Sequence, residues 1–138
     1  MNTNKKTTGL DMLDMKTKLS TLWIFVLFNV VFRDIHELFR PGFLEEIMTG
    51  TVNGIQMTEG LLLLAAIPME ILIAMVLLSR VLKYRVNRWA NISVGVIAIV
   101  FVITAEMHDL DDMFFAAVEA VTALLIIWYA WKWPKQEA

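Results

Sequence analysis

The sequence predicts an all-α integral membrane protein, a four-transmembrane-helix bundle with a short extracytoplasmic surface helix after the first span. Hydrophobic residues make up 58% of the 138-residue chain, and the mean hydropathy is +0.62. This apolar share exceeds that of ordinary soluble domains. The excess falls into four apolar runs of bilayer-spanning length, separated by short polar links. We therefore expect one transmembrane domain over residues 19–134, flanked by tails at 1–18 and 135–138.

The first span is expected at residues 19–39. Its uninterrupted apolar part, residues 19–32, is only about 21 Å long as a helix, whereas the hydrocarbon core is about 30 Å thick. Arg33, His36 and Glu37 must therefore lie inside the outer membrane boundary or at it, with long side chains reaching toward the headgroups.

The segments on either side of this span are shorter and more polar. Residues 1–18 have weak apolar spacing from Asp11, which fits a short surface helix and a frayed tail about equally well. After the span, Pro41 and Gly42 end the helix. The apolar spacing of residues 43–48 then predicts a short helix lying on the outer membrane surface, followed by a turn that leads back into the membrane.

Three further spans complete the predicted bundle. The second is expected at residues 57–82, with Pro68 and Glu70 near its middle. The third is expected at residues 89–104 and the fourth at 113–133, with a brief acidic link between them.

The lysines and arginines predict the orientation. All of them except Arg33 and Arg40 fall in the N-terminal tail, around the link between the second and third spans, or at the C-terminal end from Lys132 onward. Under the positive-inside rule both termini are cytoplasmic, in an inner or plasma membrane, and His36 faces outside. The tryptophans would form a belt at the cytoplasmic interface: Trp23, Trp89, Trp128, Trp131 and Trp133.

Polar side chains within the spans predict a pocket. A charge at the bilayer centre costs at least about 2.5–3.5 kcal/mol, so each one needs a partner or a function. At about 100° per residue, Asn29, Arg33 and His36 share a stripe, whereas Asp34 points elsewhere. We expect an outward-opening funnel whose lining residues are Asn29, Arg33, His36, Glu37, Glu70 and Glu119, with His108, Asp109 and Asp112 at its mouth.

The third and fourth spans also have small-residue faces suited to close helix packing. On the third span this face includes Asn87, Asn91 and Gly95; on the fourth it runs from Asp112 through Glu119.

Structural roles remain open for the charged groups of the funnel. Arg33 can pair with Glu37 one turn along the helix, or bridge to Glu119 and hold two spans together. Glu70 can be protonated and bonded to a carbonyl freed by Pro68.

A divalent metal ion is one candidate ligand, because imidazole and carboxylate groups bind zinc, iron and manganese. Its candidate ligands are His36, His108, Asp109 and Asp112, although neither HExxH nor Glu-x-x-His is present. A bis-histidine haem would use the same histidines. The chain has no cysteine, which excludes thiolate sites, and no basic patch that would indicate nucleic-acid binding.

Binding of a small ligand or divalent cation is the first function that these residues predict. One alternative is a proton-coupled small-molecule transporter acting as a homodimer, since four-span small multidrug transporters also use a membrane-embedded glutamate. Their glutamate lies in the first span, whereas Glu70 lies in the second. Another alternative is a membrane-embedded metal- or haem-dependent enzyme, with its catalytic residues unknown.

Four segments carry a resemblance to a known family: FLEEIMTG (43–50), GIQMTEG (54–60), PMEILIAMVLLSRVLKYRVNRWANI (68–92) and IIWYAWKW (126–133). They resemble an uncharacterised prokaryotic family of small four-span membrane proteins. The resemblance implies the four-helix fold, places Glu70 in the shared pattern and implies no activity. The RDIHELF and EMHDLDD segments lie outside that pattern. A looser similarity of plan links the chain to DoxX-like four-span proteins.

Overall fold

The computed structural model describes residues 3–105, 107 and 109–134, with the backbone alone for residues 3–10 and 12. Its elements are the helices α1 (Thr3–Glu37), α2 (Phe43–Met48), α3 (Glu59–Val81), α4 (Tyr84–Thr104) and α5 (Leu110–Lys132), and the short strands β1 (Thr51–Val52) and β2 (Ile55–Gln56). The predicted all-α bundle is confirmed. Each of the four long helices contains a segment long and apolar enough to cross a membrane.

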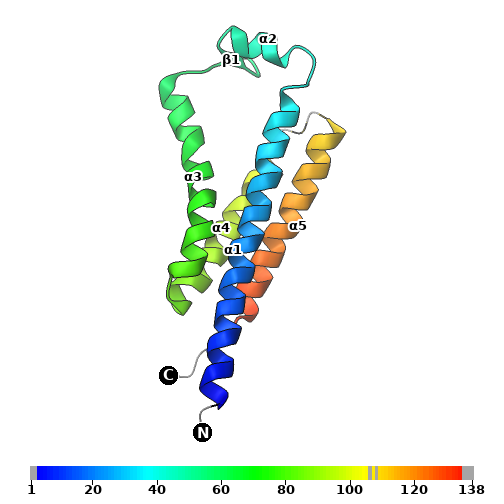
Figure 1. Ribbon diagram of the computed structural model, residues 1–138. Coiled ribbons are helices and arrows are strands. Elements are labelled where there is room, and N and C mark those ends of the chain that lie inside the picture. The colour runs from blue at the N-terminus through cyan, green and yellow to red at the C-terminus, as the bar shows by residue number, and fades with distance from the viewer. Residues whose placement is uncertain (1–2, 106, 108, 135–138) are drawn as a thin grey trace.

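The long helices lie side by side, and α2 with the β1–β2 hairpin caps one end (Figure 1). Helix α1 packs against both α3 and α5, and α5 packs against α4. Contacts between α3 and α4 are sparse, although a short link joins them. At the end opposite the cap, α1 begins and α5 ends (Figure 1). The bundle is therefore closed along α1 and α5 and loose between α3 and α4.

Helix α1 is longer than the sequence predicts. It runs for 35 residues without a break, so it includes most of the expected N-terminal tail. Within this part, Lys18 Nζ pairs with Asp14 Oδ2 at 3.1 Å, one helical turn away. Extending an existing helix is easier than starting a new one, which explains why the tail continues α1 and forms no separate surface helix. The membrane-length part of α1 is Leu13–Glu37.

The cap is built from a tight turn and a hairpin. Gly42 has φ 84°, a left-handed conformation that lets the chain turn from α1 into α2. Asn53 and Gly54 have positive φ values of 50° and 74°, as a two-residue hairpin loop requires. Glu46 Oε1 accepts a hydrogen bond from Gly54 N at 2.9 Å, which ties the hairpin to α2. The helix predicted at residues 43–48 is present; its position on a membrane surface stays a prediction.

The link between α3 and α4 is shorter than expected. Helix α4 begins at Tyr84, so Arg85 and Arg88 lie in its first two turns. Arg88 fits there because its Nη2 donates to the Trp131 carbonyl oxygen at 3.0 Å. Two basic residues of the expected link, Arg85 and Arg88, are thus part of a helix.

The hydrophobic core lies toward the end opposite the cap. Trp23 and Trp133 belong to it, with exposed fractions of 0% and 3%, so these two side chains face the interior of the bundle. The predicted interfacial belt stays a prediction. Trp89, Trp128 and Trp131 are exposed. The buried core cluster consists of Leu19, Trp23, Val26, Met75, Ile126, Ala130 and Trp133.

Small residues bring α4 and α5 close together, as predicted. Asp112, Ala116, Glu119, Ala123 and Ala130 are all buried on one face of α5. The tightest point on the facing helix is Gly95, where an added Cβ would lie 2.7 Å from Ile127 Cγ1.

Replacing Gly95 with alanine should lower the stability of the bundle by about 1–3 kcal/mol, the usual cost of overpacking. Thermal unfolding of the purified protein in detergent measures the change. Gly60→Ala is the matched control, because an added Cβ there meets nothing within 4 Å. Equal losses in the two variants would contradict a close α4–α5 contact at Gly95.

Candidate functional site

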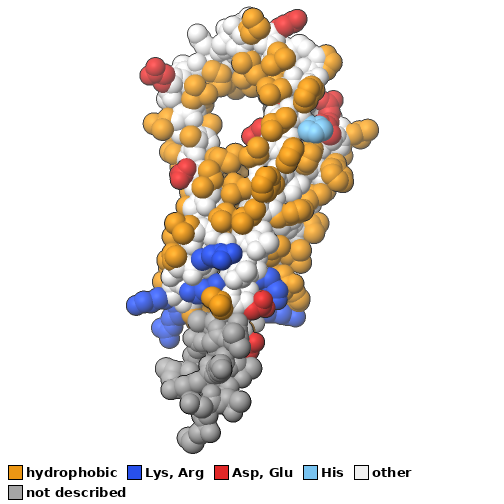
Figure 2. Space-filling view, viewed as in Figure 1, with side chains coloured by type: hydrophobic (Ala, Val, Ile, Leu, Met, Phe, Trp, Pro, Cys, Tyr) orange, Lys and Arg blue, Asp and Glu red, His pale blue; other side chains and the backbone are white. Residues whose placement is uncertain are grey.

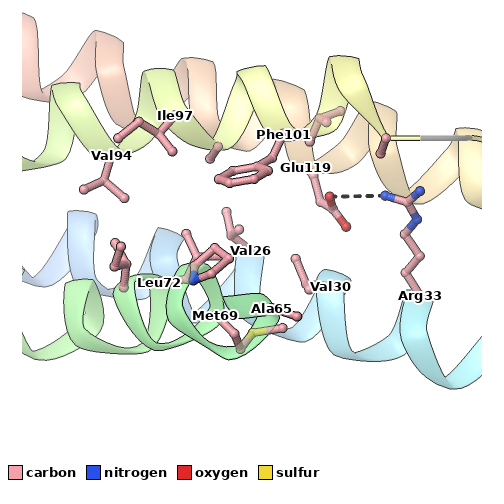
Figure 3. A pocket seen from close by; sticks show the side chains of 15 residues that line it. Val26, Val30, Arg33, Ala65, Met69, Leu72, Val94, Ile97, Phe101 and Glu119 are labelled. Atoms are coloured by element: carbon pink, nitrogen blue, oxygen red, sulfur yellow. Dashed lines mark ion pairs between the residues drawn. The ribbon is translucent and has the colours of Figure 1, made fainter. Parts of the chain in front are cut away.

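An arginine and two carboxylates form the centre of the candidate site. Arg33 Nε donates to Asp112 Oδ1 at 3.3 Å, and Arg33 Nη1 lies 4.0 Å from Glu119 Oε2 (Figure 3). Asp112 and Glu119 are each 5% exposed, and the Arg33 side chain is 17% exposed. We call these three residues the Arg33 cluster. The predicted bridge from Arg33 to Glu119 is present.

Helix geometry explains the cluster. Asp112 and Glu119 are seven residues apart, which is about 10 Å and close to two full turns of α5. They therefore lie on one face, with Ala116 between them. Because Ala116 is small, α1 can approach α5 closely enough for one guanidinium to reach both carboxylates.

One atom of the cluster lacks a partner. Oε1 of Glu119 is buried and has no hydrogen-bond partner within the described chain. A buried polar atom without a partner costs free energy, since it has lost water and gained nothing in exchange. Such an atom is a natural place for a ligand's hydrogen-bond donor.

The cluster separates two spaces. The first, the vestibule, has a volume of about 480 Å³ and lies beneath the cap. Figure 2 shows an opening between α3 and α1 under α2 and the hairpin. The vestibule is lined by Arg33, Asp34, Glu37, Phe43, Val52, Asn53 and Asp112.

The second space, the apolar cavity, has a volume of about 270 Å³ and lies between α3 and α4. Arg33 and Glu119 lie together at one end of it, and hydrocarbon side chains from α1, α3 and α4 surround the rest (Figure 3). Its other lining residues are Val26, Val30, Ala65, Pro68, Met69, Ile71, Leu72, Val94, Ile97, Ala98, Phe101, Val102 and Ala105.

His36 lies away from both spaces. Its Nδ1 is 3.5 Å from Asp111 Oδ2, its ring packs edge-on against Phe115, and half of its side chain is exposed. Glu37 pairs with Arg40 at 2.7 Å, between Oε1 and Nη2, and lines the vestibule. The residues of the predicted stripe on α1 therefore have different surroundings. Arg33 faces the interior of the bundle, whereas His36 contacts Asp111 and Phe115 of α5 and is half exposed.

Asp34 corrects another expectation. The helical stripe suggested that it points away from the pocket, but it lines the vestibule together with Arg33 and Glu37. The reason is that α3 leans away from α1 near the cap (Figure 1), which leaves a wide part of the α1 surface facing open space.

Asn29 and Glu70 are not brought to the site. Asn29 Nδ2 donates to the Phe25 carbonyl oxygen at 2.8 Å, within its own helix. Glu70 is exposed on α3, although its neighbours Pro68 and Met69 line the apolar cavity.

The predicted metal ligands are only partly described. His108 lies outside the described residues. Among the residues that the structure describes, no three histidine, aspartate or glutamate side chains are grouped so that they could hold a metal ion. Asp109 is exposed at the start of α5, and Asp112 pairs with Arg33.

Among known protein families, residues 12–138 match the one described as a family of unknown function, DUF6326. The chain belongs to the DUF6326 family. No curated protein and no solved structure matches it. The match agrees with the resemblance to an uncharacterised family of small membrane proteins. The looser likeness to DoxX-like proteins stays a prediction.

This DUF6326 chain also contains a buried polar network that the sequence analysis missed. Asn91 Oδ1 accepts hydrogen bonds from Trp23 Nε1 at 2.7 Å and from Ser79 Oγ at 3.1 Å. Asn91 Nδ2 donates to Asn87 Oδ1 at 2.7 Å, and Asn87 Nδ2 donates to the Ser79 carbonyl oxygen at 2.6 Å. All four residues are fully buried. The available signal was two asparagines one helical turn apart at the start of an apolar run.

The two polar groupings of the DUF6326 chain differ in chemistry. Asn91 accepts hydrogen bonds from α1 and α3 and donates within α4, so each of its polar atoms has a partner, which is typical of a structural network. The Arg33 cluster has one positive group facing two negative ones, an orphan oxygen, and open space on both sides. The cluster is therefore the better candidate for ligand binding.

Proposed function

We propose that this DUF6326 protein is a multi-pass protein of the inner or plasma membrane that binds a small ligand in an outward-facing pocket formed by the vestibule and the apolar cavity. Four membrane-length helices, with mean hydropathies between 1.4 and 2.7, support insertion in the bilayer. Figure 2 shows lysine and arginine side chains gathered at the end opposite the cap. Under the positive-inside rule this end, where α1 begins, is cytoplasmic and the cap is outside.

The orientation can be tested by labelling single cysteines, since the chain has none of its own. In intact cells, a membrane-impermeant maleimide should label Met48→Cys in the cap, where 87% of the side chain is exposed. The same reagent should label Lys83→Cys, in the exposed α3–α4 link, only after the cells are opened. The reverse pattern would place the pocket on the cytoplasmic side.

Ligand binding is supported by one observation above all: the orphan Oε1 of Glu119 lies at the end of an apolar cavity. A structural ion pair needs no cavity beside it, and a tightly packed core would fill that space. A site for a small molecule combines apolar walls with a few polar groups that fix its orientation, as this cavity does.

A thermal-shift screen tests the proposal. The compounds should include neutral, cationic and anionic small molecules, with Zn²⁺ and Mn²⁺ because the sequence predicts a metal site at His36 and His108. At least one compound should stabilise the protein, by about 2.7 kcal/mol when present at 100 times its dissociation constant. Ala98→Phe fills the cavity and should abolish the effect. A screen without a hit, or equal effects on this variant, would overturn ligand binding at the cavity.

Transport coupled to protons, by a homodimer, is a second candidate. The observation in its favour is the burial of Glu119, because a buried carboxylate can take up either a proton or a cationic ligand but not both. Ligand addition to unbuffered protein in detergent should then release protons, and Glu119→Gln should abolish the release. Glu70→Gln, which changes an exposed carboxylate, is the matched control.

A further inference from the structure

We propose that the ligand is a protonated amine with an apolar body, whose ammonium group binds Glu119 and whose hydrocarbon part fills the apolar cavity. This inference rests on the proposed function and gives the ligand its chemical class.

The hydrogen-bonding capacity of Glu119 favours a donor. An ionised carboxylate can only accept hydrogen bonds. Oε2 faces Arg33 at 4.0 Å, whereas the buried Oε1 has no partner among the described residues. A ketone, ether or carboxylate ligand would bring a further acceptor to an oxygen that needs a donor. A hydroxyl or an ammonium group can satisfy it.

The charge of the surroundings favours the ammonium group over the hydroxyl. Among the described residues, Arg33 is the cation that pairs with both buried carboxylates, Asp112 and Glu119. Asp34 adds another acid at the adjoining vestibule, where Glu37 is already paired with Arg40. When these acids are ionised, the region has an excess of negative charge, and a low-dielectric surrounding makes that excess costly. A monovalent cation at Oε1 reduces it.

The walls favour an organic cation over a metal ion. Calcium takes six to eight oxygen ligands, and magnesium also requires a shell of oxygens. Apart from Arg33 and Glu119, the cavity that adjoins Oε1 is lined by hydrocarbon, for example Val30, Leu72 and Phe101. Such walls can cover an alkyl or aromatic group, which gains free energy by leaving water. The sparse α3–α4 contact provides a route by which an amine dissolved in the bilayer can enter.

Three matched compounds test the class: phenethylamine, which is cationic at neutral pH, phenethyl alcohol, which is neutral, and hydrocinnamate, which is anionic. Each is titrated into the purified full-length protein and binding is followed by calorimetry. The amine should bind at least about tenfold more tightly than the alcohol, as expected when a hydrogen bond becomes charge-assisted. The acid should bind more weakly than either.

Three variants test whether the amine binds at Glu119. Glu119→Gln should weaken amine binding by about tenfold or more and leave alcohol binding within a few fold, since an amide oxygen still accepts a hydrogen bond. Glu70→Gln should change neither. Ala98→Phe should weaken both compounds without altering the charges. Helix content and elution volume of each variant show whether it is folded.

The outcomes separate this inference from the proposed function. If alcohol or acid binds as tightly as amine, or if folded Glu119→Gln keeps full amine affinity, the amine class is wrong while the pocket still binds ligands. If no compound of the three binds, the amine class is also wrong, and the broader thermal-shift screen decides whether the pocket binds anything.

Discussion

Replacing Arg33 with glutamine should destabilise the protein by about 3 kcal/mol or more, because removing one partner of a buried ion pair leaves the other charge uncompensated. In this protein two carboxylates, Asp112 and Glu119, each 5% exposed, would lose their ion pair with Arg33. The free energy of unfolding in detergent, measured by denaturant titration, gives the effect. A loss below about 1 kcal/mol, the size expected for an exposed salt bridge, would contradict a buried ion pair at Arg33.

The carboxylates themselves provide the control. If the loss comes from unpaired negative charge, adding Asp112→Asn and Glu119→Gln to the Arg33 variant should restore much of the stability, because no ionised group then lacks a partner. Lys18→Gln removes a largely exposed ion pair with Asp14 and should have little effect. Losses that simply add, without recovery in the triple variant, would mean that Arg33 contributes through packing and not through its charge.

Much of the fold follows from the sequence because apolar runs and their lengths are properties of single segments. The face of α5 from Asp112 to Ala130 was also predictable, since residues seven apart return to one side of any helix. The bridge from Arg33 to Glu119 followed from depth along two helices. Each of these inferences needs only the positions of residues along the helix axes.

The parts that the sequence misplaced depend on how neighbouring helices are rotated and tilted. Glu70 was expected to line the funnel, but its side chain is exposed on the outside of α3. Asp34 reaches the vestibule because α3 leans away from α1, and no helical wheel contains that tilt. The His36 side chain points toward Asp111 of α5, whereas Arg33, on the predicted stripe of the same helix, faces the interior. A wheel gives angles within a helix, whereas a site depends on angles between helices.

The half of the bundle near the cap and the half at the opposite end differ in how closely their helices pack. Toward the cytoplasmic end in the proposed orientation, α1, α3 and α4 are joined by the hydrogen bonds of Asn91 and covered by the core around Trp23. Toward the cap, α3 separates from the other helices and leaves the vestibule and the apolar cavity. A bundle that is open in one half needs its other half to fix the helix positions, so the site depends on residues far from it.

Replacing Asn91 with leucine should therefore cost about 3 kcal/mol or more, since buried hydrogen-bonding groups left without a partner lose about 1–3 kcal/mol each. The orphaned groups are Trp23 Nε1, the Ser79 hydroxyl and Asn87 Oδ1, all in residues that are 0% exposed. Denaturant titration in detergent measures the loss, and Ser93→Ala, at an exposed position of the same helix, should leave the stability nearly unchanged. Trp23→Phe removes one of the orphaned donors, so its cost should be smaller in the Asn91→Leu background than in the native chain. Equal costs in both backgrounds would show that the indole–amide hydrogen bond does not couple α1 to α4.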